Sequence, residues 1–314
     1  MKTNAHSKSY LSKEIADARR LVRHIQHGYD RMTLWIDSSD PDLLPITLIN
    51  SLCEGGAKLF PRSLGFHPVW KLKLQMLQPT RKALTVVRDA LGTEHNVLIT
   101  KIEVTVDFIT RSSSEASEIE AFLLEHLVVP HWRNEVRLEA EYGTIHHFAP
   151  RYAGPEGSDA GSDPEEDEDR DPADSTRRVR SKNFGLYADK ESKLAGPWSG
   201  RACAHFESRL SGSKAIKEAG IGSMSDLLAF DHPGYWERTI RLKRIESLLT
   251  LGRWTDLDEP DVSDEMLRRR AHHYLNSFRL AGGQFVMQNA LLANRTLSEV
   301  LVDVPVGLFF AAKD

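Results

Sequence analysis

Four short segments of the chain alternate apolar and polar residues, as β-strands do when one face packs on a core. They are Lys101–Phe108, Thr144–Phe148, Phe184–Lys190 and Ala202–Leu210. Carboxylates, a tyrosine and a histidine stand at their polar positions, where a sheet that needed only to fold would carry Ser, Thr or Lys. Such groups hold divalent metals and attack phosphate, so the pattern favours phosphate chemistry on one face of a sheet.

The same periodicities predict the remaining elements. Further strands are expected at Met32–Ile36, at Trp70–Met76, from Val97 into the first segment above, and in a hairpin that runs from Val136 to Phe148. Helices are expected from Pro79 to Gly92, from Ser114 to Leu127, and over Met224–Phe230, Tyr235–Leu251, Glu265–Leu280 and Gln284–Leu301. Ser112 and Glu115 have the spacing of a capping box before the second helix. This order predicts an α+β fold: a mainly antiparallel sheet covered by helices, with a helical C-terminal extension. A doubly wound parallel sheet would need helical crossovers between the later strands, and these are missing.

An acidic stretch interrupts the strands. Residues 154–174 carry ten acids against one base, so removing their net charge of −9 from the −4 of the whole chain leaves +5 elsewhere. The stretch has no large apolar residue and is expected to be disordered. We interpret residues 151–180 as an insertion in one domain that spans residues 30–255, after an N-terminal helix or tail (1–29) and before the helical extension (256–314). A linker between two domains is the alternative, but the strands on both sides share the same character.

Composition narrows the function classes. The 40% hydrophobic and 27% charged residues are ordinary for a globular protein. The chain has no apolar run of about 20 residues and no secretory signal, so we expect a cytoplasmic protein without a membrane partner. Cys53 and Cys203 are expected to be free thiols. No Walker, GxSxG, HExxH or CxxC sequence occurs, which disfavours a nucleotide-binding enzyme.

The candidate metal ligands are Asp107, Glu207 and His205. His205 and Glu207 stand two apart on one strand, roughly 7 Å between Cα atoms, so both can reach one ion, and the donor set suits Mn²⁺ or Mg²⁺. Glu103 lies about 13 Å along its strand from Asp107, and Asp107 is preferred because it is nearer the strand end. The alternatives are a solvated strand face for Asp107 and cross-strand pairing, for example of Glu207 with an arginine.

The candidate nucleophile is Tyr187, which shares a strand face with Asp189 and precedes Lys190. A phenol with a pKa near 10 attacks phosphate poorly unless a metal or a lysine assists. The alternative is a half-buried structural tyrosine. The His146–His147 pair sends one ring to each face, and a structural role is favoured there.

Basic residues gather toward the C-terminus. One cluster comprises Arg238, Arg241, Lys243 and Arg244, and a second comprises Arg268–Arg270 with His272 and His273. Such clusters can bind DNA phosphates, although a solvated charged face explains each of them equally well.

Several of these pieces resemble the replication initiators of rolling-circle plasmids and filamentous-type phages. The resembling pieces are Leu34–Asp37, Val104–Phe108, Gly143–Phe148, Tyr187–Lys190, His205–Leu210 and Asp226–Asp231, in the family's order. Initiators of this kind nick one strand of an origin by attack of a tyrosine, which becomes linked to the 5′ phosphate, and they use a divalent metal. The resemblance implies Tyr187 as nucleophile, Lys190 as its helper, and Asp107 and Glu207, with His205, as ligands of Mg²⁺ or Mn²⁺.

The resulting hypothesis is a plasmid or phage replication initiation protein that acts as a site-specific single-strand DNA endonuclease. Its expected partners are origin DNA, as a single strand or hairpin, and a host helicase, while the oligomeric state stays open, a dimer included. The alternatives are a catalytically degenerate DNA-binding protein on the same scaffold, and a metal-dependent nuclease without a covalent intermediate.

Overall fold

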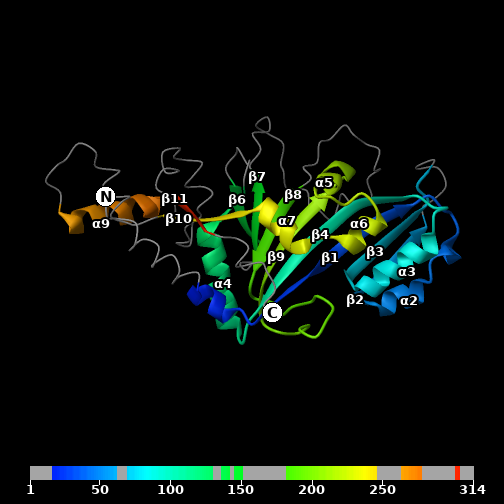
Figure 1. Cartoon of the computed structure of the whole chain (residues 1–314), viewed down its shortest axis with the longest axis horizontal. Helices are drawn as coiled ribbons and strands as arrows, with labels where there is room; N and C mark the ends of the chain where they lie inside the picture. Colours follow the sequence, from blue (N-terminus) through cyan, green and yellow to red (C-terminus); the bar gives the residue numbers. More distant parts are fainter. Residues whose placement is uncertain are drawn as a thin grey trace.

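A computed structural model describes residues 16–61, 69–129, 136–141, 145–150, 182–245, 263–277 and 301–304. An eight-stranded antiparallel sheet runs through it in the order β2-β3-β1-β4-β9-β8-β7-β6 (Figure 1). Its strands are β1 (His24–Ile36), β2 (Cys53–Pro61), β3 (Leu72–Pro79), β4 (Val97–Ile109), β6 (Val136–Glu141), β7 (Ile145–Pro150), β8 (Lys182–Tyr187) and β9 (Cys203–Ser211). The predicted α+β class is therefore confirmed.

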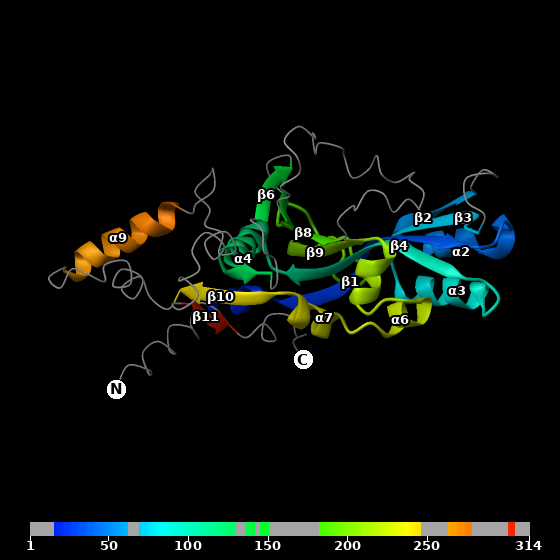
Figure 2. The same cartoon turned by 90° about the horizontal axis from the view of Figure 1, so that it is seen from above.

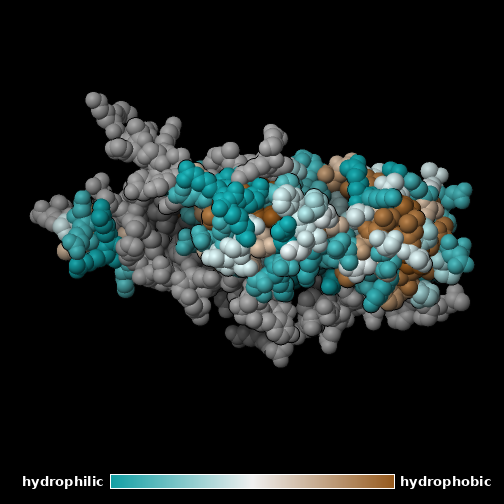
Figure 3. All heavy atoms as spheres, turned by 90° about the horizontal axis from the view of Figure 1, so that it is seen from below, coloured by the Kyte–Doolittle hydropathy of each residue, from teal (hydrophilic) through white to brown (hydrophobic). Residues whose placement is uncertain are grey.

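Helices cover one face of the sheet. They are α2 (Ile46–Ser51), α3 (Arg81–Leu91), α4 (Ser113–His126), α5 (Ser213–Glu218), α6 (Met224–Ala229) and α7 (His232–Thr239), and a short 3-10 helix, η1, spans Pro41–Leu43. Figure 2 shows α3, α6 and α7 together on one side of the strands. The core between the layers holds fully buried side chains from both, such as Leu34 and Leu74 of the sheet and Trp236 of α7. Seen from below, apolar residues gather at the end of the molecule that holds α2 and α3, where Leu48 is exposed (Figure 3).

Capping interactions explain where two of the predicted helices, α3 and α4, begin. The Thr80 side chain accepts a hydrogen bond from the Ala83 backbone N–H at the start of α3, and Gly92, with φ of 56°, ends that helix. The Ser112 hydroxyl accepts from the Glu115 backbone N–H, as the capping-box spacing predicted. The hairpin is confirmed as β6 and β7. Cys53 and Cys203 are free thiols, also as predicted.

A second, three-stranded sheet corrects one predicted helix. β10 (Arg241–Ile245) lies between β5 (Leu127–Val128) and β11 (Leu301–Val304), so the helix expected over Tyr235–Leu251 ends as α7 at Thr239. Pairings with two segments distant in the sequence, β5 and β11, stabilise β10 as a strand. The helix α9 (Asp264–Ser277) agrees with the predicted Glu265–Leu280. The acidic insertion and most of the predicted helix Gln284–Leu301 lie outside the described residues.

The second face of the sheet is polar but buried. On β4, Glu103 is 6% exposed and Asp107 is fully buried, so a solvated strand face is the wrong interpretation of Asp107. Residues 188–202, which connect β8 to β9, lie on this face and are tied to β1, because the Gln26 amide donates to the carbonyls of Leu194 and Ala195. β1 begins at His24 and so takes in the last residues of the segment 1–29. None of the helices in the described ranges is long and apolar enough to cross a membrane.

Candidate active site

Strand register brings the predicted site residues together on the polar face. His205 of β9 lies directly opposite Asp107 of β4 on one side and opposite Tyr187 of β8 on the other. Side chains directly opposite one another on neighbouring strands share a face, and Glu207 joins that face two residues beyond His205. Residues far apart in the sequence thus meet in one row across three adjacent strands.

The imidazole of His205 is held between two carboxylates. Its Nδ1 lies 2.6 Å from an oxygen of Asp107 and its Nε2 lies 3.2 Å from an oxygen of Glu207. The other oxygen of Asp107 accepts from the hydroxyl of Ser192. The guanidinium of Arg209 donates from Nε to Glu207 over 2.6 Å. Both residues belong to β9, so this pair runs along one strand and is not the cross-strand pairing named as the alternative; the residues opposite Glu207 are Thr105 and Gly185. Acids, imidazole and guanidinium form one buried network.

The network shifts the ionisation of its members. Burial alone would lower the pKa of His205, but the charges of Asp107 and Glu207 outweigh it and raise that pKa to about 10. Burial would raise the pKa of Glu207, but Arg209 and His205 outweigh it and bring that pKa to about 2. Burial and then the charge of Glu207 raise the pKa of Glu103 to about 7, although the charges of Arg209, which is directly opposite on β9, and of Arg31 act to lower it.

A third carboxylate, which the sequence analysis missed, completes a candidate cation site. Ligand atoms of Asp30, His205 and Glu207 all lie within 4.8 Å of one another. Asp30 comes from β1, within the irregularity in the pairing of β1 with β4 between Tyr29 and Met32, and accepts a hydrogen bond from the Gln78 amide. Asp107, the ligand that the resemblance implies, is on the Nδ1 side of the imidazole, away from the Glu207 contact.

A signal for Asp30 does exist in the sequence. Gln26, Gly28 and Asp30 alternate with Ile25, His27 and Tyr29, which extends the strand pattern back from the predicted Met32 start. If the alternation is followed back to His24, Asp30 falls on the strand and on the same face as Gln26 and Gly28.

Tyr187 packs directly against the candidate cation site. Its ring stacks on that of His205, with 4.4 Å between centroids and 27° between planes, and is 5% exposed. Burial, and then the charges of Glu207, Asp30 and Asp107, raise the pKa of the Tyr187 phenol well above its usual range. The Lys190 ammonium lies 5.3 Å from the centre of the same ring. The phenol is therefore protonated in this arrangement and lies beside the groups that could change its ionisation.

Gly185 explains how the tyrosine strand fits so closely. A Cβ at this position would lie 2.8 Å from a carboxylate oxygen of Glu207. The carboxylate occupies the space that a side chain on β8 would need, so only glycine allows Glu207 to lie beneath this strand.

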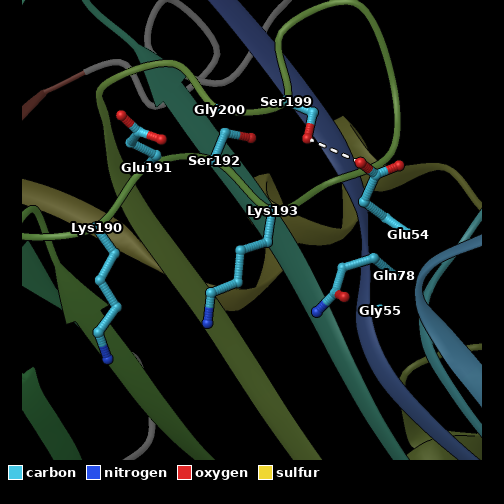
Figure 4. A pocket seen from close by; sticks show the side chains of 9 residues that line it. All are labelled: Glu54, Gly55, Gln78, Lys190, Glu191, Ser192, Lys193, Ser199 and Gly200. Atoms are coloured by element: carbon cyan, nitrogen blue, oxygen red, sulfur yellow. Dashed lines mark hydrogen bonds between the residues drawn. The ribbon is translucent and has the colours of Figure 1, made fainter.

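A pocket of about 510 Å³ opens beside the buried network (Figure 4). Two of its lining residues also touch the site, since Ser192 donates to Asp107 and Gln78 donates to Asp30. In Figure 4 the side chains of Lys190 and Lys193 extend side by side, and Ser199 donates to Glu54 over 3.4 Å. The pocket lining therefore combines two ammonium groups with the carboxylates of Glu54 and Glu191, next to the buried network.

The four basic residues predicted to bind DNA do not share one surface. Arg238 is exposed on α7, and Arg241 and Lys243 lie on one face of β10, where Lys243 pairs with Asp303 over 2.9 Å. Arg244 falls on the other face of β10 and is 5% exposed. A strand in place of the expected helix separates them, because alternate residues of a strand point to opposite faces.

Comparison with known proteins gives little beyond this geometry. No family model and no curated protein matches the sequence. Among solved structures, a rolling circle replication initiator protein from Geobacillus stearothermophilus is similar over 88% of this chain and 96% of its own, with a TM-score of 0.36 and 9% sequence identity.

Stability should fall between pH 7 and pH 10 because of His205. The pKa of His205 rises from 6.5 to about 10 on folding, so its protonation contributes fully to the free energy of unfolding below pH 6.5. This contribution is lost as the pH rises through 10. His205→Gln cannot titrate, so it should be less sensitive to this pH range than the wild type. The measurement is denaturant unfolding at both pH values in EDTA. A difference between wild type and variant that does not change with pH would contradict the assignment.

Proposed function

We propose that this chain is a replication initiation endonuclease that nicks single-stranded origin DNA by attack of Tyr187, assisted by a divalent metal. One observation carries the proposal: the Tyr187 ring is stacked on His205, one of three residues whose ligand atoms converge within 4.8 Å. A tyrosine in contact with a cation site can acquire the nucleophilicity that an isolated phenol lacks. The order of the initiator-like pieces along the chain supports the same function.

The converging residues fit Mg²⁺ or Mn²⁺. Two carboxylates and one imidazole are oxygen and nitrogen donors of the kind these ions accept. Ligand atoms about 2.1 Å from one ion are at most about 4.2 Å apart. The three ligand atoms lie within 4.8 Å of one another, so binding would need them to close by only a short distance. Asp30, Glu207 and the Nε2 of His205, which must give up its proton to bind, would hold the ion. When bound, the ion supplies charge that polarises a phosphate and lowers the pKa of a nearby phenol. Asp107 fixes the imidazole from its Nδ1 side, as carboxylates behind metal-binding histidines do.

The chain's own residues would perform the transfer. The Tyr187 phenol gives up its proton and its oxygen bonds to phosphorus, while the bond from phosphorus to the 3′ oxygen breaks and that oxygen leaves as a hydroxyl. Lys190, above the ring, favours the phenolate and balances charge on the phosphate. The product is a 5′-phosphotyrosine, which keeps the energy of the phosphodiester for rejoining.

A second candidate function is metal-dependent hydrolysis without a covalent intermediate. The observation that favours it is the burial of Tyr187, whose pKa lies above its usual range in the described arrangement. Tyr187 would then serve only to position His205 by stacking, and water would be the nucleophile.

A covalent-capture assay separates the candidates. The probes are single-stranded oligonucleotides that tile the origin of the encoding replicon, labelled at the 3′ end and incubated with the protein and Mn²⁺. Transfer of label to the denatured protein is the expected result, because the tyrosine keeps the 5′ phosphate of the labelled fragment. Cleavage without labelled protein would favour hydrolysis, and the absence of cleavage would favour a DNA-binding protein without catalysis.

Mn²⁺ should stabilise the protein through Asp30. A ligand that binds only the folded state at about 100 times its Kd adds about 2.7 kcal/mol, so the thermal midpoint should rise by several degrees. Asp30→Asn removes one anionic ligand at nearly constant shape and should lose most of this rise. Asp40→Asn is the matched control, because Asp40 is an exposed cap of η1 and asparagine caps equally well. Equal Mn²⁺-dependent rises in both variants would contradict the assigned ligand.

A further inference from the structure

A second feature lies on the polar face of the sheet, along β1, β3 and β2. The Lys73 ammonium stands 6.0 Å from the centre of the Trp35 ring and 5.7 Å from the centre of the Phe60 ring. The strand register agrees with these two contacts, because Trp35 is directly opposite Lys73 and Lys73 is directly opposite Phe60. These three side chains therefore form one row across three strands, with a cation between two aromatic rings.

This row is on the same face as the candidate active site. Lys101 stands two residues before Glu103 on β4 and pairs with Thr33, which is two residues before Trp35. The charge of Arg31 lowers the pKa of Glu103, so it lies near that carboxylate. The alternate positions Met32 and Leu34 point into the core beneath the helices.

The charge of this surface is of one sign. We call basic face the outward positions Arg31, Thr33 and Trp35 of β1, Lys58 and Phe60 of β2, Lys73 and Gln75 of β3, and Lys101 of β4. Four of these eight residues are cationic and none is acidic. Phe60 is 41% exposed and Lys58 is also exposed, whereas Lys73 and Trp35, next in the same row, are buried. The basic face thus presents an exposed aromatic ring with an exposed lysine on the same strand and the buried ammonium group of Lys73 beside it.

We propose that the basic face binds single-stranded DNA and leads it to the active site. Phe60 supplies a surface on which a base stacks, and Lys58 and Lys101 attract phosphates. Stacking on an aromatic ring needs a base that is not already stacked in a duplex, and it tolerates any sequence. The proposal rests on the proposed function only for its choice of DNA as the ligand, and it places DNA binding away from Arg238, Arg241, Lys243 and Arg244.

The test measures binding without cleavage. Fluorescein-labelled (dT)12 is titrated in EDTA, and anisotropy is followed at several salt concentrations. Phe60→Ala should weaken binding about tenfold with an unchanged salt slope, because stacking is not ionic. Lys58→Ala and Lys101→Ala should each reduce the salt slope by about 0.7, the value for one phosphate contact with a single strand.

Matched controls come from the helical face. Leu48→Ala removes an exposed apolar side chain of α2, and Lys82→Ala removes an exposed lysine of α3, so both should bind (dT)12 like the wild type. Thermal unfolding checks that every variant is folded. The proposal is overturned if Phe60→Ala and Lys58→Ala also bind like the wild type, or if a duplex or poly-glutamate of equal charge competes as well as (dT)12.

The outcome is separable from that of the nicking assay. Loss of (dT)12 binding in Phe60→Ala, in a protein that forms no covalent adduct, would support the basic face and count against the nuclease. Normal adduct formation, in a protein whose (dT)12 binding is unchanged by Phe60→Ala and Lys58→Ala, would support the nuclease and count against the basic face.

Discussion

Tyr187→Phe should abolish transfer of label to the protein in the covalent-capture assay. Phenylalanine fills the same volume and keeps the stack on His205, so the substitution removes only the oxygen that would bond to phosphorus. Removal of a covalent nucleophile lowers rates by about 10⁴-fold or more in enzymes of this kind. The measurement is labelled protein as a function of time in Mn²⁺, with wild type and variant at equal concentration.

Tyr29→Phe is the matched control. Tyr29 is also a buried strand tyrosine, but it faces the helices and its hydroxyl donates to the Leu227 carbonyl over 3.0 Å. The control should lose one hydrogen bond, about 1 kcal/mol of stability, and keep full adduct formation. If Tyr187→Phe forms adduct at the wild-type rate, Tyr187 is not the nucleophile. If it cleaves at the wild-type rate and neither protein is labelled, hydrolysis is the reaction.

Alternation along strands explains why much of the site could be predicted. A period of two decides which residues share a face, and β4, β9 and β8 are neighbours in the sheet. Asp107 and Glu207, and likewise Tyr187 and His205, could therefore be assigned to polar strand faces, whereas the row that they form depends on the strand order and register of the folded sheet. The same rule predicted Glu207 on the same face as His205.

Contacts between distant segments account for what was missed. Asp30 joins the site because β1 runs back to His24 and its pairing with β4 is irregular between Tyr29 and Met32, which periodicity alone does not reveal. β10 is a strand because β5 and β11 flank it, although its sequence continues from a helix. The burial of the polar face depends partly on residues 188–202, whose path the sequence does not specify. Each of these features depends on long-range packing, which local propensity cannot encode.

Glu207→Ala should destabilise the fold by about 3–5 kcal/mol, which is the usual cost of removing one partner from a buried ion pair. Glu207 lies between two cations, accepting from Arg209 over 2.6 Å and contacting His205 at 3.2 Å. Without it, both would keep positive charge in a buried place that no longer holds their shared anion. Denaturant unfolding at pH 6 in EDTA measures the change with His205 protonated.

Glu218→Ala is the control that tests whether loss of an exposed ion pair destabilises the fold as much. Its partner Lys214 lies 3.9 Å away and both side chains are largely exposed, so this change should cost less than about 1 kcal/mol. Glu207→Gln should fall between the two, because the amide keeps the shape and can still accept from Arg209, but loses the charge. A Glu207→Ala protein as stable as Glu218→Ala would mean that water enters and solvates the cations. The acids would then not form the dry, closely held network on which both the candidate cation site and the Tyr187 assignment depend.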